Sequence, residues 1–202
     1  MKLHWSPRSP FVRKVMIFLH EIDMVNSVKL ERSRVAMTEP NPNVMKDNPL
    51  NKIPTLVMDN GWTLFDSRVI CEYLDALHSK EKLFPVQTEF KWKALRYQAF
   101  GDGMLDALVL WRNELSKPSP LSELCAAFEL KINTSLDKLE EEVKELSELP
   151  FCIGHISVGC SLGYMDFRFQ NFDWRKDHEE LAKWHKIFEG RPSVQATKPS
   201  EG

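Results

Sequence analysis

Ser9-Pro10-Phe11-Val12-Arg13-Lys14-Val15 follows the short run Met1-Lys2-Leu3-His4-Trp5, and together they read as a strand, a turn and the start of a helix. Apolar residues then recur at spacings of three and four, which predicts a helix from about Pro10 to Leu19. Proline suits the first helical position, which leaves Ser9 as the N-cap. The free N–H groups and the helix dipole favour an anion beside its hydroxyl. Taken alone, such a serine is more often only a cap.

Composition sets the class of protein. The 202 residues, 43% of them hydrophobic, are enough for one large domain or two small ones. A net charge of −2, from 27 basic and 29 acidic residues, gives no general attraction to nucleic acid or to an anionic membrane. The N-terminus lacks the apolar core of a signal peptide, and no run of about 18 apolar residues occurs. We therefore expect a cytoplasmic protein with a small-molecule or protein partner.

The cysteines give no sign of a metal site. Cys71, Cys125, Cys152 and Cys160 include no C-x-x-C pair and have no histidines at zinc spacing. In a reducing compartment a disulfide is not expected either. We interpret all four as structural thiols and predict no bound metal.

The first part of the chain alternates strand and helix signals. After the first helix we predict a strand, a polar proline-bearing stretch, a hairpin around an Asn-Gly turn, and a helix that Ser67 opens and that ends near His78. The order is βαβ followed by ββα. The strands are expected at Asn26–Glu31, Thr55–Met58 and Trp62–Phe65, with the polar stretch at Arg32–Pro49 and the turn at Asp59-Asn60-Gly61.

Beyond residue 79 only helix signals remain, and such a shift marks a domain boundary. We predict an α/β domain at residues 1–78, a linker at 79–87 and an all-helical domain at 88–202. Its four apolar stripes lie in 90–115, 124–146, 158–169 and 181–188. The run Glu140-Glu141-Glu142 is interpreted as a solvated helix face.

Two further stretches carry chemistry. Ile53-Pro54 stands directly before a strand, where a cis bond would turn the N–H and C=O of Ile53 outward for pairing with an extended peptide. Asp66-Ser67 stands at a helix start, where the free N–H groups suit a carboxylate and Asp66 suits an ammonium, as in an amino-acid zwitterion. The plainer alternatives are a trans proline and a routine helix cap.

In this order the three stretches resemble the glutathione S-transferases, and more narrowly the bacterial, serine-type cytosolic members. The resemblance covers nearly the whole chain. It implies a thioredoxin-like first domain, a cis Pro54 and an all-helical second domain. Its motifs are Ser9-Pro10-Phe11 with Arg13 and Val15, Asn51-Lys52-Ile53-Pro54-Thr55-Leu56, Leu64-Phe65-Asp66-Ser67 with Ile70 and Tyr73-Leu74, Gly159-Cys160-Ser161-Leu162-Gly163-Tyr164-Met165-Asp166-Phe167-Arg168 and Arg191-Pro192-Ser193.

The resemblance also implies roles. Ser9 would hydrogen-bond the glutathione sulfur, Ile53 would pair with the cysteinyl unit, Lys52 would meet the glycyl carboxylate, and Asp66 with Ser67 would hold the γ-glutamyl end. Glutathione would be the co-substrate, an electrophilic small molecule the second substrate, and the protein a homodimer. The alternatives are a glutathione-dependent isomerase, dehalogenase or peroxidase, or a non-enzymatic interaction protein on the same fold.

Several points stay open. Ser6 also precedes a proline and rivals Ser9, although the spacing of the residues that follow favours Ser9. The central helix lacks the family's usual Ser/Thr-x-x-Asp capping box and reads Cys152-Ile153-Gly154-His155, so Ser157 is the alternative cap, which would give a shorter helix. The family likeness further suggests residues of the long helices: Met104, Leu108 and Trp111 at the acceptor pocket, and Asp102 reaching glutathione across a dimer.

Overall fold

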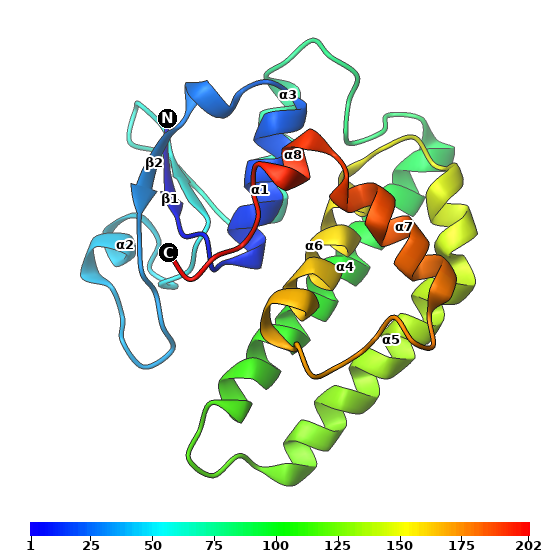
Figure 1. Ribbon diagram of the computed structural model, residues 1–202. Helices are drawn as coiled ribbons and strands as arrows, with labels where there is room; N and C mark the ends of the chain where they lie inside the picture. The colour runs from blue at the N-terminus through cyan, green and yellow to red at the C-terminus, as the bar shows by residue number, and fades with distance from the viewer. The chain divides into compact units, whose positions relative to one another are not determined.

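In the computed structural model, which describes residues 1–202, a four-stranded mixed sheet organises the N-terminal part (Figure 1). The strand order is β2-β1-β3-β4, with β1 and β2 parallel and the other two pairs antiparallel. The strands are β1 Lys2–Trp5, β2 Lys29–Arg32, β3 Thr55–Val57 and β4 Thr63–Leu64. This sheet is the scaffold on which the candidate site is built.

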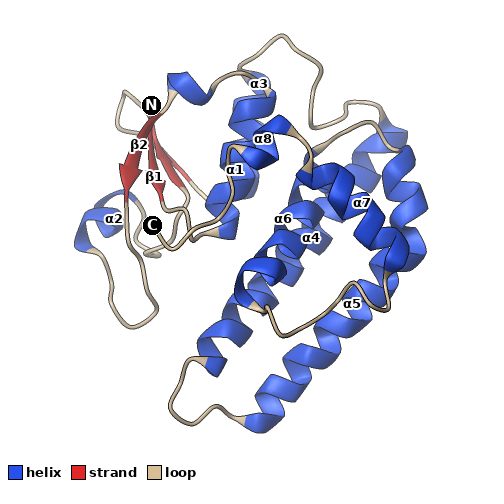
Figure 2. Cartoon of the chain, in the orientation of Figure 1, coloured by secondary structure: helices blue, strands red, loops and turns tan.

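Helices cover both faces of this sheet. Figure 2 shows α1 (Pro10–Glu21) and α3 (Ser67–Ala76) on one face and the short α2 (Pro42–Asp47) on the other. The crossover through α1 lets β1 and β2 run parallel, whereas the tight turn at Gly61 joins β3 and β4 as a hairpin. The predicted thioredoxin-like βαβ-ββα order is therefore confirmed.

The helix α2 was not predicted. It lies in the polar stretch and buries only Val44, so its sequence has no apolar stripe that would indicate a helix. Its two ends are held by polar contacts: Asn41 Oδ1 accepts the N–H of Val44, and Asp47 Oδ2 lies 2.7 Å from Nε2 of the fully buried His4. The hydrogen bond from His4 holds the pKa of the Asp47 carboxyl below its ordinary value. His4 thus has a structural role.

The predicted second strand starts three residues late. A 3₁₀ turn, Val25–Ser27, occupies the expected beginning, and β2 runs from Lys29 to Arg32. The turn forms because the chain must reverse after α1 before it can pair with β1, and Lys29 N–H donates to Met1 O at 3.0 Å where the pairing begins.

The second compact unit is Pro85–Arg191 and consists of four helices, as predicted. They are α4 Thr88–Leu115, α5 Ser122–Glu148, α6 Ile153–Arg168 and α7 Glu179–Glu189. Every residue of α6 from Ile153 to Met165 is buried, so this helix forms the centre of the structure around it. Such an all-round apolar helix has no polar face to show in the sequence.

Glycine permits the close approach of α4 to α6. A Cβ on Gly101 would lie 2.4 Å from the backbone carbon of Ser157, far inside van der Waals contact. Two residues further along α4, a Cβ on Gly103 would meet nothing within 4 Å. Packing against α6 therefore requires glycine at position 101 but not at position 103.

The capping box of α6 is present, which corrects the prediction that it is missing. The N–H of Cys152 donates to Nδ1 of His155 at 3.2 Å, and the Cys152 sulfur accepts the backbone N–H of His155. Because these two residues reproduce the reciprocal pattern of Ser and Asp, the helix begins at Ile153 and Ser157 lies inside it. Burial lowers the pKa of His155 to about 4, which keeps the imidazole neutral and able to accept.

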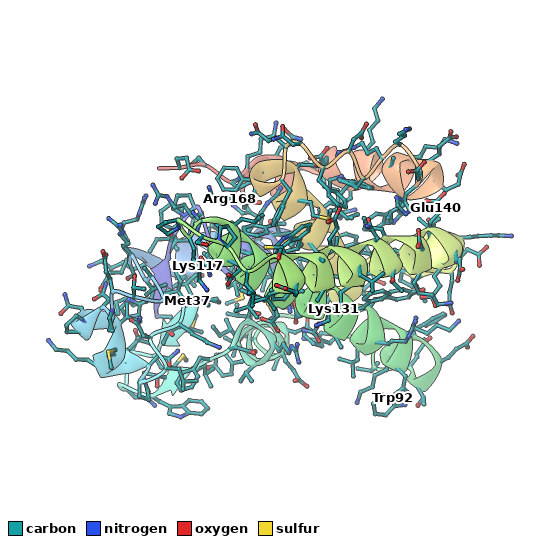
Figure 3. The ribbon with its side chains drawn as sticks, turned by 90° about the horizontal axis from the view of Figure 1, so that it is seen from below. Met37, Trp92, Lys117, Lys131, Glu140 and Arg168 are labelled. Carbon is teal, nitrogen blue, oxygen red and sulfur yellow. The ribbon has the colours of Figure 1, made fainter.

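The acidic run on α5 binds other elements as well as solvent. Glu140 accepts the N–H groups of Glu180 and Leu181 at 3.0 and 2.8 Å, so it caps the start of α7 (Figure 3). Glu142 makes a bidentate pair with Arg96 of α4 at 2.7 and 2.9 Å. The prediction of a purely solvated face is wrong for these two carboxylates.

The last eleven residues pack with the N-terminal part, which forms a unit of Met1–Phe84 and Pro192–Gly202. This differs from the expected assignment of residues 88–202 to one helical domain. The segment contains the short α8 (Pro192–Gln195), and it is held by polar contacts to α1 and to the β1–α1 loop, among them Ser193 to Glu21 and Ser200 N–H to Pro7 O. None of the helices has the length and apolarity needed to cross a lipid bilayer.

We predict opposite effects of alanine at the two glycines of α4. Gly101→Ala should lower the free energy of unfolding by about 1–3 kcal/mol or more, because backbone atoms of α6 must move. Gly103→Ala should be neutral or raise it by up to about 1 kcal/mol through helix propensity. Urea unfolding followed by circular dichroism measures both, and equal effects would contradict the close approach.

We also predict a pH dependence that belongs to His155. The unfolded chain binds a proton on this imidazole below about pH 6.5, whereas the folded chain binds it only below about pH 4. The free energy of unfolding should therefore decrease as the pH is lowered from about 6.5 to about 4, by at most about 1.4 kcal/mol per pH unit. The double variant Cys152→Ser/His155→Asp restores a common capping box without the imidazole and should lose this fall. Cys152→Ser alone keeps His155 and should retain it. Urea unfolding at about pH 7 and about pH 5 measures the change in the free energy of unfolding, and an equal change in the unaltered chain and in the double variant would refute the assignment.

Candidate functional site

The register of the sheet brings the three predicted stretches to one end. His4 pairs with Thr55 across β1 and β3, and Leu56 pairs with Leu64 across β3 and β4. Because both pairings are antiparallel, the residues just after β1, just before β3 and just after β4 all lie at the same end of the strands. These residues are Ser6–Ser9, Ile53-Pro54 and Phe65–Ser67.

Ser9 has the geometry expected of an N-cap. Its Oγ accepts the N–H of Val12 at 3.3 Å, and the residue is only half-buried. Since the oxygen accepts from the helix, the hydroxyl proton is free to donate outward. Ser6, the rival, is 8% exposed, and its Oγ accepts the N–H of Arg8 at 3.4 Å within the loop. Of the two serines, Ser9 is the more exposed.

Ile53 presents an unpaired stretch of main chain. The Ile53–Pro54 peptide bond is cis, as the family resemblance predicts. The hydrogen bonds of the loop serve its neighbours and leave the N–H and C=O of Ile53 without a partner inside the chain. Main-chain groups in folded proteins are almost always paired, so an extended peptide or water must complete this position. The Ile53 side chain is buried and anchors it.

The sequence reasoning missed the residue that builds this loop, Asn48. It is fully buried, and its side-chain amide donates to Lys52 O at 3.1 Å and to Thr55 Oγ1 at 3.0 Å. Its Oδ1 accepts the N–H of Leu50 at 3.0 Å. The Asn-Pro pair at positions 48 and 49 is a turn signal, but nothing in it shows that the amide points inward.

Asp66 and Ser67 occupy different positions at the start of α3. Asp66 is the N-cap: its Oδ1 accepts the N–H of Arg68 at 2.9 Å, and the carboxylate is exposed. Ser67 is the first helical residue and is 2% exposed. An exposed carboxylate beside the free N–H groups of a helix start can accept an ammonium while the helix holds a carboxylate. Lys52, on the neighbouring loop, is exposed and offers a further cation.

Residues expected at an acceptor pocket lie in the interior of the helical unit. Met104, Leu108 and Trp111 are between 0% and 6% exposed, and the Trp111 ring packs on Phe169 with centroids 4.8 Å apart. Asp102 is 1% exposed, which argues against the expectation that it reaches glutathione across a dimer. Their burial is that of ordinary core residues.

One cluster of possible metal ligands exists, formed by Asp166, His185 and Glu189. Both carboxylate oxygens of Asp166 already accept from the guanidinium of Arg175 at 2.6 Å, and one also accepts from Trp174 at 2.9 Å. Although burial opposes it, these donors hold the pKa of Asp166 below its ordinary value. A guanidinium in direct contact repels a cation, so we interpret the cluster as an ion-pair network.

The cysteines form no disulfide, and three of the four are buried. Burial raises the pKa of the Cys152 thiol, which disfavours the reactive thiolate. No cysteine lies in the three stretches at the end of the sheet. If the site handles a thiol, that thiol belongs to the ligand.

A thioredoxin-like unit followed by helices defines a class of protein, and comparisons with known proteins identify the family. The model "Glutathione S-transferase, N-terminal domain" matches residues 3–82. An uncharacterized GST-like protein of Escherichia coli, YibF, is 31% identical over 98% of both chains. The chain belongs to the glutathione S-transferase family.

Similar solved structures belong to the same family. A glutathione transferase family member from Pseudomonas fluorescens Pf-5, with bound glutathione, superimposes with a TM-score of 0.95 at 42% identity over 98% of each chain. A second structure from that organism, with bound S-(propanoic acid)-glutathione, gives a TM-score of 0.90 at 41% identity over 99% of this chain and all of that one. A transferase from Methylobacillus flagellatus with glutathione bound is 31% identical, with a TM-score of 0.88 over 98% and 99% of the chains.

We predict that Asn48→Ala disturbs the presentation of Ile53. Removing the buried amide should lower the free energy of unfolding by about 1–3 kcal/mol, because it leaves the Leu50 N–H and part of the Lys52 carbonyl unsatisfied. Glutathione affinity, measured by calorimetry, should fall in the folded fraction as well. Asn43→Ala, an exposed asparagine on α2, is the matched control and should change neither quantity. Normal affinity in Asn48→Ala would show that the loop does not depend on the amide.

Proposed function

We propose that this protein is a glutathione transferase, which stabilises the thiolate of glutathione and adds it to an electrophilic small molecule. The observation that carries the proposal is the unpaired main chain of Ile53, which lies at the same end of the sheet as the Ser9 hydroxyl and the Asp66 carboxylate. These groups match the middle, the sulfur and the γ-glutamyl end of one extended tripeptide.

The proposed roles follow the chemistry of each group. Ile53 pairs its N–H and C=O with the cysteinyl unit. Asp66 accepts the γ-glutamyl ammonium, while the first turn of α3 at Ser67 receives the α-carboxylate. Lys52 meets the glycyl carboxylate. Binding in this way leaves the cysteinyl sulfur directed toward the start of α1.

Ser9 then acts on the sulfur as a hydrogen-bond donor. A thiol has a pKa near 8.5, and lowering it by two units requires about 2.7 kcal/mol. A hydrogen bond to a charged group supplies roughly 1.5–3 kcal/mol, and a helix N-terminus about 0.3–1 kcal/mol more. Because Ser9 Oγ already accepts from Val12, its proton is available for this bond. Neither a general base nor a protein nucleophile is needed.

The relatives support binding of glutathione and a thioether product. Glutathione is bound in two of the similar structures, and S-(propanoic acid)-glutathione, in which the sulfur carries a carbon substituent, is bound in a third. We further propose that the enzyme is a cytoplasmic homodimer. A glutathione-dependent isomerase, dehalogenase or peroxidase, or an interaction protein, remains the alternative to conjugation.

We predict that Ser9→Ala reduces kcat/KM for conjugation of 1-chloro-2,4-dinitrobenzene about tenfold to 150-fold, because a hydrogen bond of roughly 1.5–3 kcal/mol to the thiolate is lost. Ser6→Ala should retain most of the activity. The thiol pKa of bound glutathione, followed by thiolate absorbance, should rise in Ser9→Ala only.

Calorimetry with glutathione and with S-hexylglutathione separates the alternatives. Binding of both together with conjugation supports the transferase. Binding without conjugation points to one of the other glutathione-dependent reactions, and failure to bind either ligand points to an interaction protein.

A further inference from the structure

A cavity whose lining includes none of the residues assigned to glutathione lies between α1, the β1–α1 loop and the C-terminal segment. Its volume is about 80 Å³, well above the roughly 10–15 Å³ that one water molecule needs by the same measure. All of its walls belong to the unit of Met1–Phe84 and Pro192–Gly202. They include Trp5, Val12, Arg13, Met16, Ala196 and Lys198.

Arg13 is the unusual member of this lining. The residue is only 7% exposed, and its Nε is buried without a hydrogen-bond partner. A buried guanidinium is normally paired, because leaving its charge and its donors unsatisfied is costly. No acidic residue lines the cavity, and the side-chain carboxylate of Glu201, in the nearby C-terminal segment, pairs with Arg8 at 3.2 Å.

The rest of the lining narrows the class of ligand. Apart from Arg13, the inner walls are mainly apolar, from Trp5, Val12, Met16 and Ala196. The only other charge is a second cation, Lys198, on the exposed C-terminal segment. Such walls can bury an alkyl group but cannot satisfy all the oxygens of a phosphate. The planar fork of arginine fits the two oxygens of a carboxylate.

We propose that this cavity binds a short-chain aliphatic carboxylate. The carboxylate pairs with the guanidinium of Arg13, the alkyl chain contacts Trp5 and Met16, and Lys198 adds positive charge from the C-terminal side. The inference does not depend on the glutathione site, because none of the groups assigned to that tripeptide lines the cavity.

Binding here would join two segments that are distant in sequence. Arg13 lies on α1, one turn after Ser9, and Lys198 lies on the C-terminal segment, which meets the β1–α1 loop through Ser200 N–H and Pro7 O at 3.4 Å. A carboxylate held by both cations adds a link between them. The ligand should therefore stabilise the C-terminal segment against local opening.

The test is a titration of the full chain with sodium butanoate at constant ionic strength, with butanamide as the neutral analogue of the same shape. Binding is read from the Trp5 indole N–H signal in nitrogen-15 correlation spectra, assigned with Trp5→Phe. We expect saturable shifts with butanoate and none with butanamide. Arg13→Met should weaken binding by about tenfold or more, whereas Lys29→Met, an exposed lysine on β2, should leave it unchanged.

A second variant keeps the test decisive if Arg13→Met does not fold. Ala196→Leu fills the cavity from the exposed C-terminal segment while keeping Arg13, and it should abolish the butanoate shifts. Hydrogen exchange at residues 196–201 should slow when butanoate binds to the unaltered chain. Absence of saturable shifts in the unaltered chain, or unchanged binding in Ala196→Leu, would overturn the proposal.

Discussion

The antiparallel pairing of β3 with β1 is the constraint on which the candidate site depends. With His4 opposite Thr55, the residues after β1 and the residues before β3 lie at one end of the sheet, and the hairpin brings the end of β4 to the same place. A shift of one residue would turn Leu3 and Leu56 out of the core, where both are fully buried. Hydrophobic burial therefore sets the register, and the register assembles the site.

Polar side chains shape the loops at this end of the sheet. Asn48 holds the loop before β3 and leaves the main chain of Ile53 open, while the Ser9 hydroxyl and the Asp66 carboxylate cap the first turns of α1 and α3. The same groups that stabilise helix ends and turns thus give the site its donors and acceptors. Arg13 is the exception, since its buried Nε has no hydrogen-bond partner.

The helical unit shows that one geometry can be built from different residues. A capping box needs an acceptor at the N-cap and a second acceptor three residues later, and Cys152 with a neutral His155 meets both needs. The neutrality comes from burial between Phe151 and Trp184, whose rings lie 5.3 and 6.1 Å from that of His155. Close contact of α4 with α6 in turn requires Gly101, at which any side chain would meet backbone.

Local patterns were enough to predict most elements. Apolar periodicity placed α1 and the four long helices to within a few residues, the Asn-Gly turn placed the hairpin, and the ordered motifs indicated the family and the residues at one end of the sheet. Those signals are readable because each depends on neighbours three or four positions away, or on a single turn.

Features held by distant contacts were not readable. The helix α2 depends on His4 and Asp47 meeting from different elements, the start of α7 on Glu140 from another helix, and the inward amide of Asn48 on the strand that follows. The placement of the C-terminal segment and the burial of Arg13 beside it likewise have no local pattern. The sequence thus specifies which groups can bind an anion or a peptide, and tertiary packing alone decides which are exposed, which are satisfied, and which are left to a ligand.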